Sequence, residues 1–160
     1  MYQYSFANVD LNLQVPDASG TYRSLDITGF GTGENLINIM RRAPIATTQF
    51  GAYGDMVVSM QRIKAGDLTF PVLMNAPENK TLQDYANYFQ SLADADGAPV
   101  FPIQGYMRDN MGNDVASLTN GVILAMPAMS RGQNMNTITW VLTFELVQFQ
   151  REVGVGDVRI

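Results

Sequence analysis

Apolar and polar positions alternate most regularly in the middle of the chain. Apolar residues lead to a turn at 64–67 from Val57, Val58 and Met60. After the turn, Leu68, Phe70 and Val72 alternate with Thr69 and Pro71, which is the two-residue period of a strand with one buried face. This pattern predicts a β-hairpin whose two strands pair across that turn.

A helical pattern follows directly. Apolar residues recur with the spacing of one helix face at Leu82, Tyr85, Ala86, Phe89, Leu92 and Ala93. Asn75 precedes Glu78 by three residues, which favours a capping box, and Gly97 and Pro99 favour a stop. The pattern predicts one amphipathic helix over about 77–95, which needs a larger sheet to cover.

The clearest strand is the last one. Its even-numbered face is apolar and is predicted to be core: Ile138, Trp140, Leu142, Phe144 and Leu146. Its odd-numbered face mixes hydroxyl, carboxylate and apolar groups: Thr139, Val141, Thr143, Glu145 and Val147. Such a face fits a polar lumen or a partly covered subunit contact, and it fits the edge of a twisted sheet equally well.

Shorter patterns predict strands at 4–15, 36–40, 100–106 and 116–126, with Pro102 suggesting an edge or a bulge. Turns are expected at 16–22, 109–114 and 127–136. The segment 44–55 carries Phe50 and Tyr53 among small residues, so it is either a loop that contacts a partner or an ordinary hairpin whose aromatics fold back on the core. The chain is predicted to be mainly β with one helix, as a single domain over 1–160.

Composition narrows the possible functions. Of the 160 residues 46% are hydrophobic and only 16% are charged, which is typical of a globular chain with part of its surface in interfaces. The net charge of −5 disfavours a nucleic-acid binder, and the absence of cysteine and histidine removes disulfides and the commonest metal ligand and general base. Without an apolar leader or span, we expect a soluble chain made in a cytoplasm.

Candidate chemistry is sparse. The glycine-rich segment 27–34 lacks the following helix and the lysine of a phosphate loop, and 109–114 lacks the glutamate of a calcium loop. Lys64 and Lys80 stand in no serine–lysine motif, and Asp94 and Asp96 lie at a helix end, where solvation is expected. The sequence predicts no catalytic residue, no cofactor and no metal.

The central stretch also carries a family resemblance. Its pattern S-x-x-x-x-K-A-G-x-L-T-F-x-V-L-x-x-x-P-x-N-x-x-L, together with GFGTGENLINIMRRAPIATTQFGAYGDMVVSM before it and NTITWVLTFELVQF near the end, resembles the tail tube proteins of contractile-tailed bacteriophages. The resemblance implies a β-sandwich or small barrel with one flanking helix. Subunits of that family form six-membered rings that stack into the inner tail tube, a conduit for DNA during ejection.

The resemblance also suggests roles for particular residues. Ring stacking is expected from the loop at 44–55: Thr47, Thr48, Gln49, Phe50, Gly51, Ala52, Tyr53 and Gly54. The lumen lining is expected from Ser59, Gln61, Thr69, Thr139, Thr143 and Glu145. The outer surface toward the sheath is expected from Lys80, Gln83, Asp84, Asn87 and Gln90, and the tail at 151–160 is expected to pack on a neighbour or fray.

The implied partners are copies of the chain itself, the tail sheath protein and a baseplate or tube initiator, with viral DNA passing without specific binding and with no membrane anchor. The location would be the virion tail. Alternatives from the same architecture are the tube of a type VI secretion system or phage-derived bacteriocin, and a tube-initiating or terminating ring. A monomeric ligand-binding β-sandwich and a hydrolase are the distant alternatives.

Overall fold

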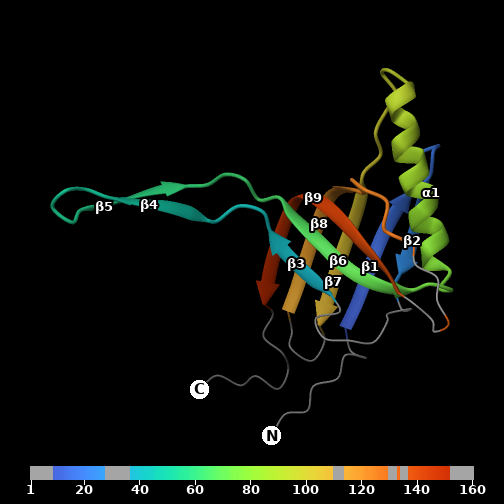
Figure 1. Ribbon diagram of the computed structural model, residues 1–160, viewed down its shortest axis with the longest axis horizontal. Helices are drawn as coiled ribbons and strands as arrows, with labels where there is room; N and C mark the ends of the chain where they lie inside the picture. The colour runs from blue at the N-terminus through green and yellow to red at the C-terminus, as the bar shows by residue number, and fades with distance from the viewer. Residues whose placement is uncertain (1–8, 28–36, 110–113, 130–132, 134–136, 152–160) are drawn as a thin grey trace, which may run out of the picture.

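The computed structural model describes residues 9–27, 37–109, 114–129, 133 and 137–151 (Figure 1). The described chain forms strands, one α-helix and one short 3-10 helix: β1 (Val9–Pro16), β2 (Tyr22–Asp26), β3 (Asn38–Arg41), β4 (Ala46–Phe50), β5 (Met56–Met60), β6 (Gly66–Leu73), α1 (Glu78–Ser91), η2 (Leu92–Asp94), β7 (Ile103–Asp109), β8 (Asp114–Val122) and β9 (Thr137–Arg151). The fold is therefore mainly β with one helix, as the sequence predicted.

Seven of the strands form one antiparallel sheet in the order β2-β1-β7-β8-β9-β6-β3, and β4 and β5 form a separate two-stranded sheet. The described strands form no closed barrel, because β2 and β3 stand at opposite edges. The second sheet extends away from the first (Figure 1). The sandwich form remains a prediction.

The pairing predicted for the central stretch is wrong. β5 pairs with β4, joining Phe50 to Met56 across a short turn, whereas β6 pairs with β9 and β3. The reason is burial: the apolar face of β6 meets that of β9, with Phe70 opposite Trp140, and both side chains are buried. β5 is exposed along its whole length and offers β6 no such face.

The helix packs on the buried face of the sheet. Leu82, Tyr85 and Ala86 join one core cluster with residues from β1, β6, β7, β8 and β9. The expected capping box is wrong, since α1 starts after Pro77 without a side-chain cap. Asn79, the second residue of α1, anchors this end instead.

Asn79 connects the start of the helix to the sheet. Its Oδ1 accepts a 2.9 Å hydrogen bond from the indole Nε1 of Trp140, and its Nδ2 donates to the carbonyl oxygens of Leu73 and Met74 at 2.7 and 3.3 Å. Because a buried indole N–H without a partner is costly, this contact fixes the helix relative to β9.

The face assignment of β9 changes along the strand. Ile138 to Phe144 alternate as predicted, but Leu146 is half-buried and Val147 is fully buried, so the prediction for these two residues is wrong. The buried partners in β8 are Gly121 opposite Phe144 and Leu118 opposite Val147. The register between β7 and β8 shifts in the same region, between Ile103 and Gly105, and Asn120 of β8 has a positive φ of 56°. The β8–β9 register is unchanged, so the change of face accompanies this local irregularity and not a slip in pairing.

Other expectations fall partly outside the described residues. β1 contains the predicted apolar positions from Val9 onward, while 4–8 lie outside, as do 28–36, 110–113, most of 130–136 and the tail at 152–160. Of the two expectations for Pro102, the edge is wrong, because β7 begins after it and lies between β1 and β8. The register between β7 and β8 does shift close by, between Ile103 and Gly105, as the expectation of a bulge requires.

Gly121 tests the packing between β8 and β9. A Cβ added to Gly121 would overlap the ring of Phe144, which is fully buried and cannot move freely. We expect Gly121→Ala to lower the free energy of unfolding by about 1–3 kcal/mol, the usual cost of overpacking. Urea unfolding measures it. Gly51→Ala is the matched control, since the nearest atom lies 3.8 Å from its added Cβ; equal effects of the two substitutions would contradict the expectation.

The buried phenol of Tyr85 should make the free energy of unfolding fall at alkaline pH. Burial raises the pKa of its phenol above the ordinary value of 10.0, and the hydroxyl donates to the carbonyl of Phe101 at 2.9 Å. As the pH rises, the Tyr85 phenol loses its proton in the unfolded state before it does so in the folded state. Its contribution to the free energy of unfolding is therefore fully present below pH 10 and declines above it. Tyr85→Phe should cost about 1 kcal/mol at neutral pH and make the decline above pH 10 shallower. Urea unfolding from pH 7 to 11 tests this, and identical pH profiles would refute it.

Candidate assembly surfaces

The β4–β5 hairpin projects from the sheet (Figure 1), and its exposed surface is largely apolar. Phe50 is 70% exposed and Tyr53, at the tip, is 97% exposed. Other large apolar side chains along and beside the hairpin are also exposed: Ile45, Met56, Val57, Val58, Met60 and Ile63. A two-stranded ribbon without a packed face is marginally stable in water, so this surface is typical of a contact with another molecule.

Hydrogen bonds define the tip of the hairpin. The N–H of Gly51 donates to the carbonyl of Asp55 at 2.7 Å, and the N–H of Gly54 donates to the carbonyl of Gly51 at 3.0 Å. Gly54 has a φ of 86°, a conformation that glycine adopts without strain. This turn holds Tyr53 away from the chain. The idea that the aromatics fold back on the core is therefore wrong, although the segment is a hairpin.

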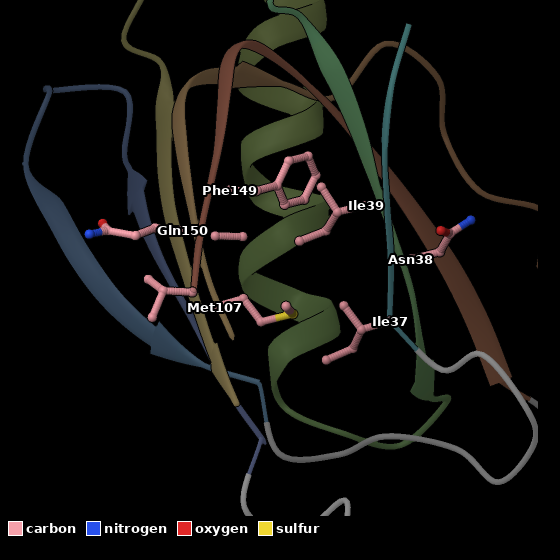
Figure 2. Close-up of a pocket in the computed structure, with 8 residues that line it drawn as sticks. Ile37, Asn38, Ile39, Met107, Phe149 and Gln150 are labelled. Carbon is pink, nitrogen blue, oxygen red and sulfur yellow. The ribbon is translucent and has the colours of Figure 1, made fainter. Parts of the chain in front are cut away.

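A groove opens on the buried side of the sheet, between edge strand β3 and strands β7–β9. It measures about 600 Å³. Figure 2 shows the side chains of Ile37, Ile39, Met107 and Phe149 converging on it, while Asn38 and Gln150 point away. The guanidinium carbon of Arg41 lies 5.7 Å from the centre of the Phe149 ring, which places a positive charge beside the groove.

The opposite face of the sheet is polar. Thr69, Thr139, Thr143 and Glu145 lie together on it, since Asp67, Thr69 and Pro71 of β6 stand opposite Thr143, Val141 and Thr139 of β9. The structure thus brings together four of the predicted lumen residues. The other two lie apart: Ser59 is exposed on the projecting hairpin, and Gln61 follows it. Their assignment assumed that β5 pairs with β6.

Hydrogen bonds link side chains across this polar face. The amide of Asn120 donates to Glu145 at 3.0 Å and its oxygen accepts from Gln104 at 2.9 Å. Next to it, Arg42 forms a salt bridge with Asp67 at 3.0 Å, and the Thr143 hydroxyl donates to the same carboxylate at 2.8 Å. Hydrogen-bonded side chains, both acidic and basic, therefore line this face.

The comparisons with known proteins identify the family. The family model for the Bacteriophage PhiTE tail tube protein matches residues 1–154. The chain belongs to this tail tube family. No curated protein matches the sequence significantly.

Solved structures of contractile injection systems share the tail tube fold. A chain in the structure of the anti-feeding prophage tube-terminating cap aligns with a TM-score of 0.55 at 9% identity, covering 95% of this chain and 93% of its own. A chain in the structure of the sheath/tube terminator of the PVC extracellular contractile injection system aligns with a TM-score of 0.55 at 10% identity, covering 94% of this chain and 98% of its own. A chain of the PVC sheath-tube complex aligns with a TM-score of 0.53 at 8% identity, covering 94% of this chain and 93% of its own. At these identities the likeness concerns the fold.

The outer helix face of this tail tube protein matches its expected composition. Lys80, Gln83, Asp84, Asn87 and Gln90 are all exposed, on the side of α1 away from the buried Leu82, Tyr85 and Ala86. The face is polar and mixed in charge. Its contact with a sheath remains a prediction.

Sequence reasoning missed several residues of these surfaces. On the polar face it overlooked Asn12, Asp67, Gln104 and Asn120. A signal was available in β1, where the polar residues Asp10, Asn12 and Gln14 alternate with buried leucines. At the hairpin it overlooked Ile45, and it placed Val57 and Val58 in a strand with a buried face although two adjacent valines already break the alternation of such a strand. Arg41 and the groove had no local signal.

Within the described part of the tail tube chain, no group of three or more acidic, histidine or cysteine residues is arranged to hold a metal ion. No described helix has the length and apolar character needed to cross a membrane. The family is that of a structural tail protein and gives no positive indication of catalysis.

Proposed function

We propose that the chain assembles into six-membered rings that stack to form the inner tube of a contractile phage tail, through which viral DNA passes. The exposed apolar hairpin is the observation that carries the proposal. Its side chains gain stability only when another molecule covers them, and at about 25 cal/mol per Å² of buried apolar area such coverage is a substantial driving force.

Ring formation uses the edges of the sheet. Among the described strands β2 pairs only with β1 and β3 only with β6, which leaves each with one unpaired side. Joining β3 of one subunit to β2 of the next would satisfy both rows of backbone groups and remove the edges. A closed ring then continues the sheet from subunit to subunit.

The polar face suits the lining of a DNA conduit. Its described acidic residues are Asp10, Asp26, Asp67 and Glu145, and its described basic residues are Arg42 and Arg108. Because a basic lining would neutralise phosphates and bind DNA, a slightly acidic one allows DNA to pass. With this face inward, the helix faces outward toward the sheath, and a baseplate component would start the tube.

Negative-stain electron microscopy across a concentration series, with light scattering alongside, tests the assembly. Hollow rings or tubes of sixfold symmetry are expected. A chain that stays monomeric at high concentration and in the presence of the baseplate would contradict the proposal and favour a monomeric ligand-binding domain.

Thiol labelling of assembled tubes tests the orientation, because the chain has no cysteine of its own. We expect Glu145→Cys to react with a small maleimide but not with a large polyethylene-glycol maleimide, and Asn87→Cys to react with both. Both positions are exposed in the isolated chain, so unassembled protein supplies the control. Rapid reaction of Glu145→Cys with the large reagent in intact tubes would place this face outside.

A ring that terminates the tube is the second candidate function, because two of the similar folds come from structures of a tube cap and a sheath/tube terminator. Copy number in purified particles separates the two roles. A tube protein is present in many rings, whereas a terminator is present in one.

A further inference from the structure

The tip of the hairpin and the groove beside β3 are complementary surfaces on the same chain. We propose that the tip of one copy, formed by Phe50, Tyr53, Asp55 and Met56, inserts into the groove of the next copy in a head-to-tail contact. This inference rests on the proposed function and names the docking site that the stacking hairpin uses.

The tip has the features of an interface anchor. Phe50, Tyr53 and Met56 are all exposed, and the tight turn at Gly51–Gly54 presents them together. Aromatic side chains that fill a partner's pocket contribute most to protein contacts, because they bury a large area with few rotatable bonds. The tip therefore needs a concave apolar partner.

The groove is the matching receptor. Its volume of about 600 Å³ lies within the range of pockets that enclose a ligand of several rings. The converging side chains in Figure 2 are apolar, and the Phe149 ring, at 54% exposed, offers a face for stacking. None of the described residues that line the groove is charged.

Charge supports the same pairing. Asp55 is the only charged residue between positions 43 and 61, so the tip is acidic. Arg41 stands beside the groove, over Phe149. Its terminal nitrogen donates to the carbonyl of Val147 at 2.8 Å, but its buried Nε has no hydrogen-bond partner among the described residues. A carboxylate arriving at the groove would meet this cation.

Geometry favours two copies in head-to-tail order. The hairpin leaves the sheet only a few residues after β3 and extends away from it, so its tip points away from the groove of its own chain (Figure 1). A tip-to-tip contact would bring two Asp55 carboxylates together. A contact between unlike surfaces, repeated from copy to copy, generates an extended stack.

Cross-linking of cysteine variants in assembled tubes tests the contact. Ala52→Cys, at the tip but outside the anchor side chains, and Ile39→Cys proteins are mixed in equal amounts, assembled and treated with a short bis-maleimide. We expect a covalent dimer containing one of each variant to take up as much as about half of the subunits, the limit for random mixing in a head-to-tail contact, and neither variant alone to form dimers. Met107→Cys replaces Ile39→Cys on the opposite side of the groove if the latter fails to fold. Thr139→Cys, on the polar face, is the control and should leave Ala52→Cys monomeric.

The possible failures are distinct. Tubes that form normally without a cross-link from Ala52→Cys to either groove position would overturn the docking site and leave the tube function standing. Dimers of Ala52→Cys alone within tubes would indicate a tip-to-tip contact and also overturn it. Absence of tubes in the unmodified protein with its baseplate would overturn both proposals.

Discussion

Replacing Phe50 and Tyr53 together with serine is expected to abolish tube formation and leave the fold intact. Both side chains are mostly exposed in the isolated chain, so the free energy of unfolding should change by less than about 0.5 kcal/mol each. In the assembled tube each is expected to act as an anchor that contributes about 2 kcal/mol or more at every contact. Electron microscopy and sedimentation measure assembly, and urea unfolding measures the fold.

The matched control for this pair changes the outer helix face. Gln83→Ser with Asn87→Ser alters two exposed polar residues of α1 and should leave tube length and critical concentration unchanged. Tubes of normal length from the Phe50/Tyr53 variant would show that the hairpin is not the stacking element. Isolated rings without tubes would instead be the most informative positive result, because they separate stacking from ring closure.

Trp140→Ala is expected to cause the largest loss of stability. Trp140 is 2% exposed, stands opposite Phe70, and donates its indole N–H to Asn79. The substitution removes a large buried ring and leaves Asn79 without this partner, so the free energy of unfolding should fall by about 3–5 kcal/mol. Urea unfolding measures the loss, best in the Phe50/Tyr53 background, where assembly does not add to the apparent stability.

Two further variants separate the causes of this loss. Trp140→Phe keeps most of the apolar volume but removes the N–H. It should lower the free energy of unfolding by less than Trp140→Ala does, because it leaves a smaller cavity. Val141→Ala, at the next position but on the polar face and 45% exposed, should cost under about 1 kcal/mol. If Trp140→Ala cost no more than Val141→Ala, the anchoring of the helix to β9 would be refuted.

Much of the candidate surface could be predicted from local pattern. The exposed helix face follows from the spacing of Leu82, Tyr85 and Ala86, since residues between them must point away from the core. The shared face of Thr139, Thr143 and Glu145 follows from alternation along one strand. The prediction for Ser59 was wrong because it depended on which strand pairs with β5. The turn residues between β5 and β6 suggested that these two strands pair, but such residues occur whether or not the flanking strands pair.

The sequence by itself determined most of the elements, their order and the apolar side of α1, β6 and the first half of β9, because helical and strand periods are properties of neighbouring residues. It also determined the family, through the order and spacing of residues along the chain. The tertiary structure alone decided that β6 pairs with β9 and that β4–β5 stands free, because strand pairing depends on which distant apolar faces bury each other. For the same reason the groove beside Arg41 appeared only when β3, β7, β8 and β9, distant in sequence, came together in one sheet.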